Sequence, residues 1–384
     1  MTGSSPVAED CPSPRLAVRR LTLSDFRCYG HLRLDTDERP VVLTGANGAG
    51  KTNLLEALSF LAPGRGLRRA SPADVGRRDA GAPLWAVAAV LEGPAGRVEI
   101  GTGREAGAER RAIRIDGQPA KAAALANLVS ALWLTPVMDR LFVEGAGGRR
   151  RFLDRLVLSQ DGRHAARAGA YEHAMRERAR LLRDGCTDGA WLAAVEEAMA
   201  RHGIALAQAR LQTVARLDEA CQAGIGRFPA ARLTLAGEVE EWLRHAATDR
   251  VEEQLRGALA HARARDMAAG VATIGPHRCD FIVRHGGKDL PAGQCSTGEQ
   301  KAVLVSIVLA QARLGARRGG MAPLLLLDEV AAHLDESRRL ALFDELVGLK
   351  AQSWMTGTDE SLFAGFGERA QFFRVADATV RPAA

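Results

Sequence analysis

The chain has 384 residues, of which 47% are hydrophobic, so it can bury a sizeable core and form two or three domains. Its 52 lysines and arginines exceed its 46 aspartates and glutamates, and the net charge of +6 permits a polyanionic partner without requiring one. The six cysteines form no C-x-x-C pair, which argues against a disulfide framework or a structural zinc site. Without a signal sequence or a bilayer-spanning apolar run, we expect a protein of the reducing cytoplasm that does not enter a membrane.

Strand patterns dominate the N-terminal part of the chain. Residues 1–14, rich in Ser, Pro and small residues, predict a disordered tail before them. Short apolar or alternating runs then predict strands. These runs are residues 16–18, 21–23, 31–34, 41–43, 85–91, 98–100 and 112–115. Because turns separate most of them, we expect an antiparallel sheet beside the sheet that holds residues 41–43.

A glycine-rich stretch follows the strand at residues 41–43. Its pattern is G-x-x-x-x-G-K-T, and it leads into residues 53–58, which have helical spacing. A strand, a glycine-rich loop and a helix in this order are typical of a P-loop, whose backbone N–H groups and helix N-terminus face phosphates. We expect Lys51 to neutralise the β- and γ-phosphates of ATP and Thr52 to ligate Mg²⁺. The candidate nucleotide-binding residues are Gly45, Ala46, Asn47, Gly48, Ala49, Gly50, Lys51, Thr52 and Asn53.

Helical patterns replace strand patterns in the middle of the chain. Ala, Arg, Glu and Leu recur at helical spacing, most clearly at residues 171–182 and 191–223. We therefore predict a helical lid at residues 145–262, inserted between an N-terminal half of the head at 15–144 and a C-terminal half at 263–384. The insertion is far too short for the long coiled-coil arm of a chromosome-organising ATPase.

Two carboxylates follow a predicted buried strand in the C-terminal half. Residues 324–327 are four leucines, a continuous apolar run typical of a parallel strand, and Asp328 and Glu329 come directly after it. This is the Walker B arrangement, in which we expect Asp328 to hold Mg²⁺ and Glu329 to act as the general base toward the attacking water. Other predicted elements are strands at residues 280–284 and 352–356 and helices at residues 301–314 and 337–349.

The segment at residues 296–300, S-T-G-E-Q, directly precedes one of these helices. It resembles the S-x-G-x-Q signature of ABC-type ATPases, in which the signature of one subunit closes on the γ-phosphate held by the P-loop of the other. A small hydroxyl, a helix N-terminus and a glycine suit an anion. A capping box, with Ser296 as N-cap and Glu299 three residues later, explains the same pattern equally well. The candidate nucleotide contacts of this segment are Ser296, Gly298, Glu299 and Gln300.

The same resemblance bears on two later segments. Residues 332–335 take the place of the D-loop, which in ABC-type ATPases runs along the dimer seam, so Asp335 is a further candidate contact. The switch His of those proteins is absent, and Thr356 and Thr358 stand where it would be expected. A Thr hydroxyl can hydrogen-bond a γ-phosphate or its water but cannot supply a proton as His⁺ would, so we expect slow hydrolysis.

Several spaced motifs together resemble the RecF family of bacterial recombination mediators over nearly the whole chain. These motifs are L-T-L-S-D-F-R at residues 21–27, I-D-G at 115–117, R-R-R-F-L-D at 149–154, G-P-H-R at 275–278, L-L-L-D at 325–328, and A-H-L-D at 332–335 with Arg338. The chain departs from the family pattern at Val137 and Cys279, where acidic residues are usual. It also has Glu329 where many members have Asp, although Glu is the ordinary base of ABC-type ATPases.

The resemblance implies an α/β head of ABC/SMC type with an antiparallel β subdomain and a helical lid. It implies an ATP-dependent homodimer that binds DNA, both double-stranded and at junctions with single strands, and a weak, DNA-dependent ATPase. It also implies help in loading RecA at single-strand gaps together with RecR and RecO. For the arginines at 149–151 and for residues 277–278, DNA contact and a purely structural role both stay open.

Two other classes of function compete with this interpretation. The nucleotide-binding subunit of a membrane transporter would carry an S-G-G-Q-type signature and a switch His, and this chain has neither. A monomeric P-loop kinase could use the helical insertion as a substrate lid, but it would leave the signature and the D-loop unexplained.

Overall fold

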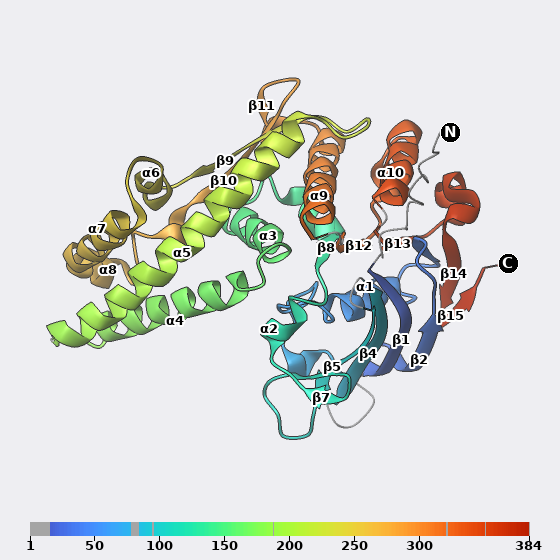
Figure 1. The fold of residues 1–384 in the computed structure, drawn as a ribbon, viewed down its shortest axis with the longest axis horizontal. Helices are drawn as coiled ribbons and strands as arrows, with labels where there is room; N and C mark the ends of the chain where they lie inside the picture. Colours follow the sequence, from blue (N-terminus) through green and yellow to red (C-terminus); the bar gives the residue numbers. More distant parts are fainter. Residues whose placement is uncertain are drawn as a thin grey trace, which may run out of the picture.

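The computed structural model describes residues 16–77, 84–93, 96–186, 188–319, 322–349 and 351–383, so the tail predicted at 1–14 lies outside the described residues. Two sheets and the helices packed on them form a head, and a group of helices extends from it as an arm (Figure 1). The predicted α/β head with an antiparallel sheet and an inserted helical part is therefore confirmed.

The first sheet of the head is antiparallel throughout. Its strands, in order across the sheet, are β2 (Tyr29–Asp35), β1 (Ala17–Phe26), β4 (Trp85–Gly93), β5 (Gly96–Arg104), β6 (Ala112–Ile115) and β7 (Gln118–Pro119). The two runs predicted at residues 16–18 and 21–23 belong to one strand, β1. A β-bulge between Val18 and Arg20 accommodates the break in alternation that had suggested two strands.

The second sheet is parallel at its centre. Its strands, in order, are β15 (Thr379–Pro382), β14 (Gln371–Ala376), β3 (Val41–Thr44), β13 (Ser353–Gly357), β12 (Leu324–Leu327) and β8 (Ala131–Leu134). Among the strands that the structure describes in this sheet, the β14–β15 pair alone is antiparallel. Because parallel strands end at the same edge of a sheet, the segments that follow β3, β12 and β13 are brought together there.

The four leucines of β12 show how this sheet divides the core. Leu324 and Leu326 face the antiparallel sheet and the helix α1 (Lys51–Ser59), whereas Leu325 and Leu327 face the helices on the other side. All four are buried, as expected for a parallel strand covered on both faces. The helices of the head other than α1 are α2 (Ala122–Leu125), α9 (Thr297–Gly319) and α10 (Glu336–Gly348).

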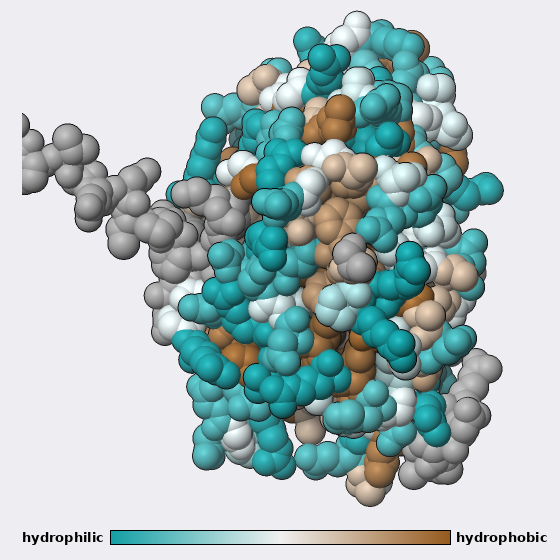
Figure 2. Space-filling model, turned by 90° about the vertical axis from the view of Figure 1, so that its right-hand side faces the viewer, coloured by the Kyte–Doolittle hydropathy of each residue, from teal (hydrophilic) through white to brown (hydrophobic). Residues whose placement is uncertain are grey.

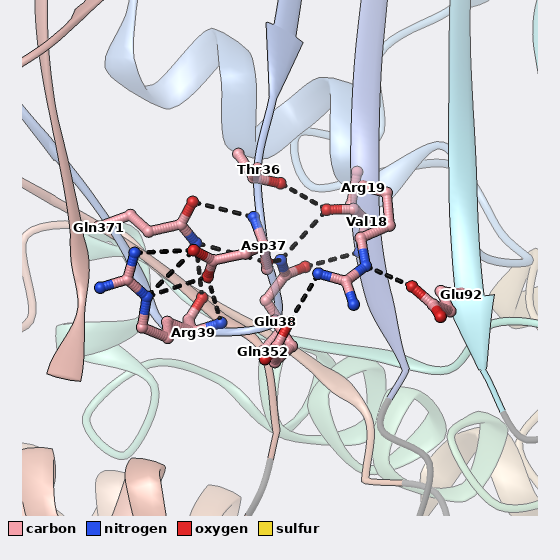
Figure 3. A network of polar contacts seen from close by, with 9 residues as sticks. All are labelled: Val18, Arg19, Thr36, Asp37, Glu38, Arg39, Glu92, Gln352 and Gln371. Carbon is pink, nitrogen blue, oxygen red and sulfur yellow. Dashed lines mark hydrogen bonds and ion pairs between the residues drawn. The ribbon is translucent and has the colours of Figure 1, made fainter.

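A buried glutamine joins the two sheets. The side-chain oxygen of Gln352, just before β13, accepts a hydrogen bond from the Val18 N–H at 2.8 Å, and its amide donates to the Asp37 carbonyl at 2.6 Å (Figure 3). Gln371 of β14 accepts from the Asp37 N–H at 2.9 Å and donates to the Arg39 carbonyl at 3.2 Å. These bonds satisfy backbone groups of β1 and of the loop between β2 and β3, and so tie the first sheet to the second.

The arm consists of helices and a small third sheet. Its helices are α3 (Ala146–Leu158), α4 (His164–Arg183), α5 (Gly189–Gln222), α6 (Glu238–His245), α7 (Thr248–His261) and α8 (Arg263–Ala269). The sheet has the order β11 (Leu290–Pro291), β10 (Asp280–His285), β9 (Ala231–Ala236). The region predicted to be helical thus contains a strand, β9, and its helices continue past residue 262 through α8. The domain limits drawn from the sequence stay a prediction.

The surface of the head agrees with this division into buried cores and solvated faces. The face that carries β14, β15 and α10 is mainly hydrophilic, with hydrophobic residues in narrower areas between the polar ones (Figure 2). Within the described ranges, no helix is both long enough and apolar enough to cross a membrane.

Candidate nucleotide-binding site

The loop between β3 and α1 has the backbone shape of a phosphate cradle. Gly45, Gly48 and Gly50 have backbone φ values of 152°, 83° and 112°. Residues other than glycine rarely adopt such angles. A Cβ atom on Gly45 would lie 2.1 Å from the Val375 carbonyl oxygen, and one on Gly50 would lie 2.6 Å from the Tyr29 hydroxyl. Glycine is therefore required at both positions by the close approach of neighbouring strands as well as by the backbone angle.

Lys51 lies buried at the start of α1, with 4% of its surface exposed. Its ammonium donates hydrogen bonds to the carbonyls of Gly45 at 2.6 Å and Ala46 at 2.9 Å, so it lies across the loop. Burial lowers the pKa of Lys51, and the carboxylates of Glu329 and Asp328 partly oppose this change. Lys51 thus lies across the P-loop, where it could meet a phosphate, and its role as the neutralising cation stays a prediction.

The Walker B residues meet the P-loop as predicted. The Thr52 hydroxyl lies 3.0 and 3.1 Å from the two carboxylate oxygens of Asp328, which follows β12. A hydroxyl and a carboxylate at this distance are hard oxygen donors that fit Mg²⁺. Glu329 has a left-handed backbone, with φ 52°, and its N–H donates to the Thr356 hydroxyl at 3.0 Å. A non-glycine residue held in this conformation is a feature of functional sites.

Thr356 has a different role from the one its position suggested. It is 1% exposed, and its hydroxyl donates to Asp328 at 2.7 Å while accepting from the Glu329 backbone. Both hydrogen-bonding functions are therefore used to order the Walker B pair, and Thr356 is not free to face a γ-phosphate. Thr358 is exposed and lines, with Gly45, a cavity of about 410 Å³ beside the P-loop.

A buried carboxylate on α1 was missed in the sequence analysis. Glu56 is fully buried and pairs with Arg27 at 2.6 Å and with Arg68 at 2.6 Å. Arg68 also donates to the side-chain oxygen of Asn53 at 2.8 Å. Glu56 therefore ties the β1–β2 turn and the basic loop after α1 to the P-loop helix. The available signal was an acid at residue 56 within the apolar run 54–58 of that helix.

The segment before α9 forms the capping box that the sequence permitted. The Glu299 carboxylate accepts from the Ser296 N–H at 3.1 Å, and the Glu299 N–H donates to the Ser296 hydroxyl at 3.4 Å. Lys288 pairs with Glu299 at 2.6 Å, and this contact, with the bonds from Ser296, lowers the pKa of Glu299 to about 2. Ser296 and Gly298 nevertheless remain exposed, so another molecule can still contact them.

Two other candidates have structural roles in this chain. Gln300 is 6% exposed and its amide donates to the Cys295 carbonyl at 2.8 Å, so it points inward in this chain, and its nucleotide contact stays a prediction. Its position as the fourth residue of α9 turns its side chain toward the core. Asp335 is exposed and caps α10 by accepting from the Arg338 N–H at 2.9 Å.

Two arginines of the R-R-R-F-L-D motif contact the residues that directly follow the G-P-H-R motif. Arg149 donates to both carboxylate oxygens of Asp280, at 2.8 and 2.9 Å, and Arg150 donates to the Cys279 carbonyl at 2.5 Å. These contacts favour the structural role that had been left open for both arginines. Arg151 and Arg278 are exposed, and DNA contact by these two residues stays a prediction.

A second network at this junction is centred on Asp154. Arg210 of α5 donates to both of its carboxylate oxygens, at 2.8 and 2.9 Å, and to the Pro276 carbonyl at 2.8 Å. His277 of the turn η4 (Pro276–Arg278) shares a 2.7 Å hydrogen bond with the Tyr171 hydroxyl. Burial by itself would raise the pKa of Asp154, but Arg210 and His164 lower it to about 2.

Acid should weaken this junction. Because the pKa of Asp154 is lower in the folded state than the ordinary 3.8, its contribution to stability is present above about pH 4 and is lost as the pH falls through about 2. The shift corresponds to roughly 2 kcal/mol. Asp154→Asn should cost about 3 kcal/mol at neutral pH because it leaves Arg210 unpaired, and the difference from the wild type should shrink toward pH 2.

Urea unfolding at several pH values measures this effect, with the exposed Asp249 changed to Asn as the matched control. A constant difference between Asp154→Asn and the wild type across the acid range would contradict the assignment.

The structure brings together the P-loop, the Walker B pair and Thr356 but leaves the signature segment apart. Within the described ranges, no hydrogen bond or ion pair joins residues 296–300 or Asp335 to residues 45–53. The fold and this half-site together define an ATPase head of the ABC/SMC class.

Comparisons with known proteins identify the family within this class. The family model of the RecF/RecN/SMC N-terminal domain matches residues 17–378. The DNA replication and repair protein RecF of Rhizobium etli is 51% identical over 371 residues, covering 95% of this chain and 99% of that protein. RecF of Caulobacter vibrioides is 52% identical over 375 residues, covering 94% and 97%. The chain therefore belongs to the RecF family of DNA replication and repair proteins.

Solved structures support the same fold. The recombination mediator protein RecF–ATP of the RecFOR pathway matches with a TM-score of 0.82 and 21% identity, covering 96% of this chain and 98% of that one. An Smc head bound to the C-winged helix domain of ScpA matches with a TM-score of 0.55 and 15% identity, covering 95% and 96%. Neither a transporter subunit nor a small-molecule kinase is supported by these relationships.

Proposed function

We propose that this protein is an ATP-gated DNA clamp that closes as a homodimer. Each ATP would lie between the P-loop of one subunit and the exposed start of α9 in the other. The observation that carries this proposal is the half-built site: the P-loop and Walker B residues converge, whereas Ser296 and Gly298 face solvent. A single head thus offers one side of a triphosphate site, and a second copy offers the other.

The residues of the site have separate tasks in this scheme. Lys51 would move from the loop carbonyls to the phosphates, whose negative charge it can neutralise. Thr52 and Asp328 would hold Mg²⁺, which neutralises charge on the triphosphate when bound. Glu329 would accept a proton from the attacking water. With no switch His, hydrolysis would be weak and would serve to release the clamp.

DNA is the proposed partner because of both charge and kinship. The net charge of +6 and the exposed Arg151 and Arg278 suit a phosphate backbone, and the relatives are DNA replication and repair proteins. By kinship with the RecFOR pathway we further propose action in the bacterial cytoplasm at junctions of double- and single-stranded DNA. There the dimer would act with RecR and RecO to help load RecA, with hydrolysis dependent on DNA.

Sizing the protein in solution with and without ATP tests the proposal. We expect a monomer that becomes a dimer with Mg²⁺ and ATP and then binds gapped DNA with falling affinity as salt is raised. A protein that binds ATP but keeps the same size would contradict the clamp.

A further inference from the structure

One buried cation near the site is used by none of the steps above. Lys301 lies on α9, five residues after Ser296, and is 5% exposed. Its ammonium forms no hydrogen bond in the part of the chain that the structure describes. The ion pair that the structure shows for it is with Asp139, at 3.5 Å, in the turn η3 (Pro136–Arg140) after β8.

The position of this ammonium relative to the site is informative. Strands β8 and β12 are parallel neighbours, and the Asp328 N–H donates to the Leu134 carbonyl at 2.8 Å. The turn with Asp139 therefore starts beside the Walker B residues. Burial lowers the pKa of Lys301, and the carboxylates that oppose this change are Asp139, Glu329 and Asp328. The ammonium thus pairs with an acid of the turn that begins beside the Walker B residues.

Such a residue is poorly explained by packing alone. A buried ammonium without a hydrogen bond is destabilising, and a methionine of similar length would fill the space without that cost. The retained charge therefore points to a role in the site. Glu299 and Gln300 already fix the first turn of α9 to the backbone around it, so what remains for Lys301 is to fix that turn to Asp139.

We infer that Lys301 is a positioning residue for ATP hydrolysis. It holds the first turn of α9, which carries Ser296, to Asp139, in the turn that starts beside the Walker B residues of the same subunit. In the dimer, α9 reaches the partner's ATP while Lys301 stays paired with Asp139 beside its own site. This ion pair then links the two ATP sites through each subunit. This inference rests on the proposed function.

Replacing Lys301 by Met separates this role from a structural one. We expect kcat for ATP hydrolysis to fall at least about tenfold, while the affinity of the P-loop for ATP stays within about twofold. The melting temperature should stay the same or rise, because a buried ammonium is removed. Asp139→Asn, at a more exposed position, should lower kcat in the same direction. Lys121→Met, at an exposed position directly before α2, is the control.

Each outcome has one meaning. A folded Lys301→Met protein with wild-type kcat, or one whose kcat, ATP affinity and melting temperature all fall together, would overturn the inference. If Lys301→Met does not fold, an unchanged kcat in Asp139→Asn overturns it instead. Lys51→Ala in the same assay tests the proposed function separately: full hydrolysis by that variant would refute the ATP site itself, whatever Lys301 does.

Discussion

Lys51→Ala should abolish high-affinity ATP binding. The ammonium of Lys51 is the buried cation at the start of α1, and it already lies against two loop carbonyls that a triphosphate would replace as its partners. Losing its charge-assisted hydrogen bonds should weaken ATP binding about a hundredfold, or roughly 3 kcal/mol. Titration calorimetry or a fluorescent ATP analogue measures the change.

The folded state should tolerate this substitution. Lys51 is held by neutral carbonyls, and burial lowers its pKa more than the attraction of Glu329 and Asp328 raises it, so removing this charge should cost the folded state little. We therefore expect an unchanged or higher melting temperature in the absence of nucleotide. Lys121→Ala, at an exposed position, should keep wild-type affinity. If Lys51→Ala bound ATP as tightly as the wild type, the phosphate-binding role of residues 45–52 would be wrong.

Glu329→Gln should trap an ATP-bound dimer. Glutamine has the same shape as glutamate but cannot accept the proton of the attacking water, and general-base catalysis contributes about 10²–10⁴-fold to rate. The backbone hydrogen bond from residue 329 to Thr356 does not involve the side chain, so the local geometry should persist. Light scattering after size exclusion with Mg²⁺ and ATP should show a dimer that dissociates far more slowly than that of the wild type.

Two controls complete this experiment. Glu105→Gln, at an exposed position directly after β5, should hydrolyse ATP as the wild type does. The double variant Lys51→Ala with Glu329→Gln should stay monomeric, since no triphosphate is held. A Glu329→Gln protein that binds ATP and remains monomeric would count against dimer closure.

Local patterns predicted the parts of the fold that depend on a few adjacent residues. The structure contains the expected strand, loop and helix around residues 45–52 and the expected strand of four leucines before Asp328. Both patterns could be recognised because the backbone freedom of glycine and a continuous apolar run are properties of short segments. The capping box at Ser296 and Glu299 is likewise local. The break in the alternation of β1 was misread as two strands, because a bulge can be recognised only from the neighbouring strand.

Long-range contacts decided what could not be predicted. Strand β9 lies in a stretch dominated by helical patterns, and it is a strand because it pairs with β10, more than forty residues later. Gln300 is buried, and the Thr356 hydroxyl donates its hydrogen bond to Asp328. Both contacts depend on how α9 and β13 pack on their neighbours, which the sequence does not show. In the sequence, Glu56 cannot be distinguished from any other charged residue of a helix. Its role follows from the ion pairs with Arg27 and Arg68, which lie outside that helix.

By itself, the order of residues determined the chemistry: a phosphate cradle with a lysine, a carboxylate pair after an apolar strand, and a serine-tipped helix. Each of those features depends on residues only a few positions apart, so the backbone freedom of glycine and the pattern of apolar residues can be recognised from the sequence. Only the tertiary structure decided that the cradle and the carboxylates converge, since this follows from parallel strands ending at one edge of a sheet. It alone also placed the tip of α9 in solvent and Lys301 inside, because burial is a property of the packed chain.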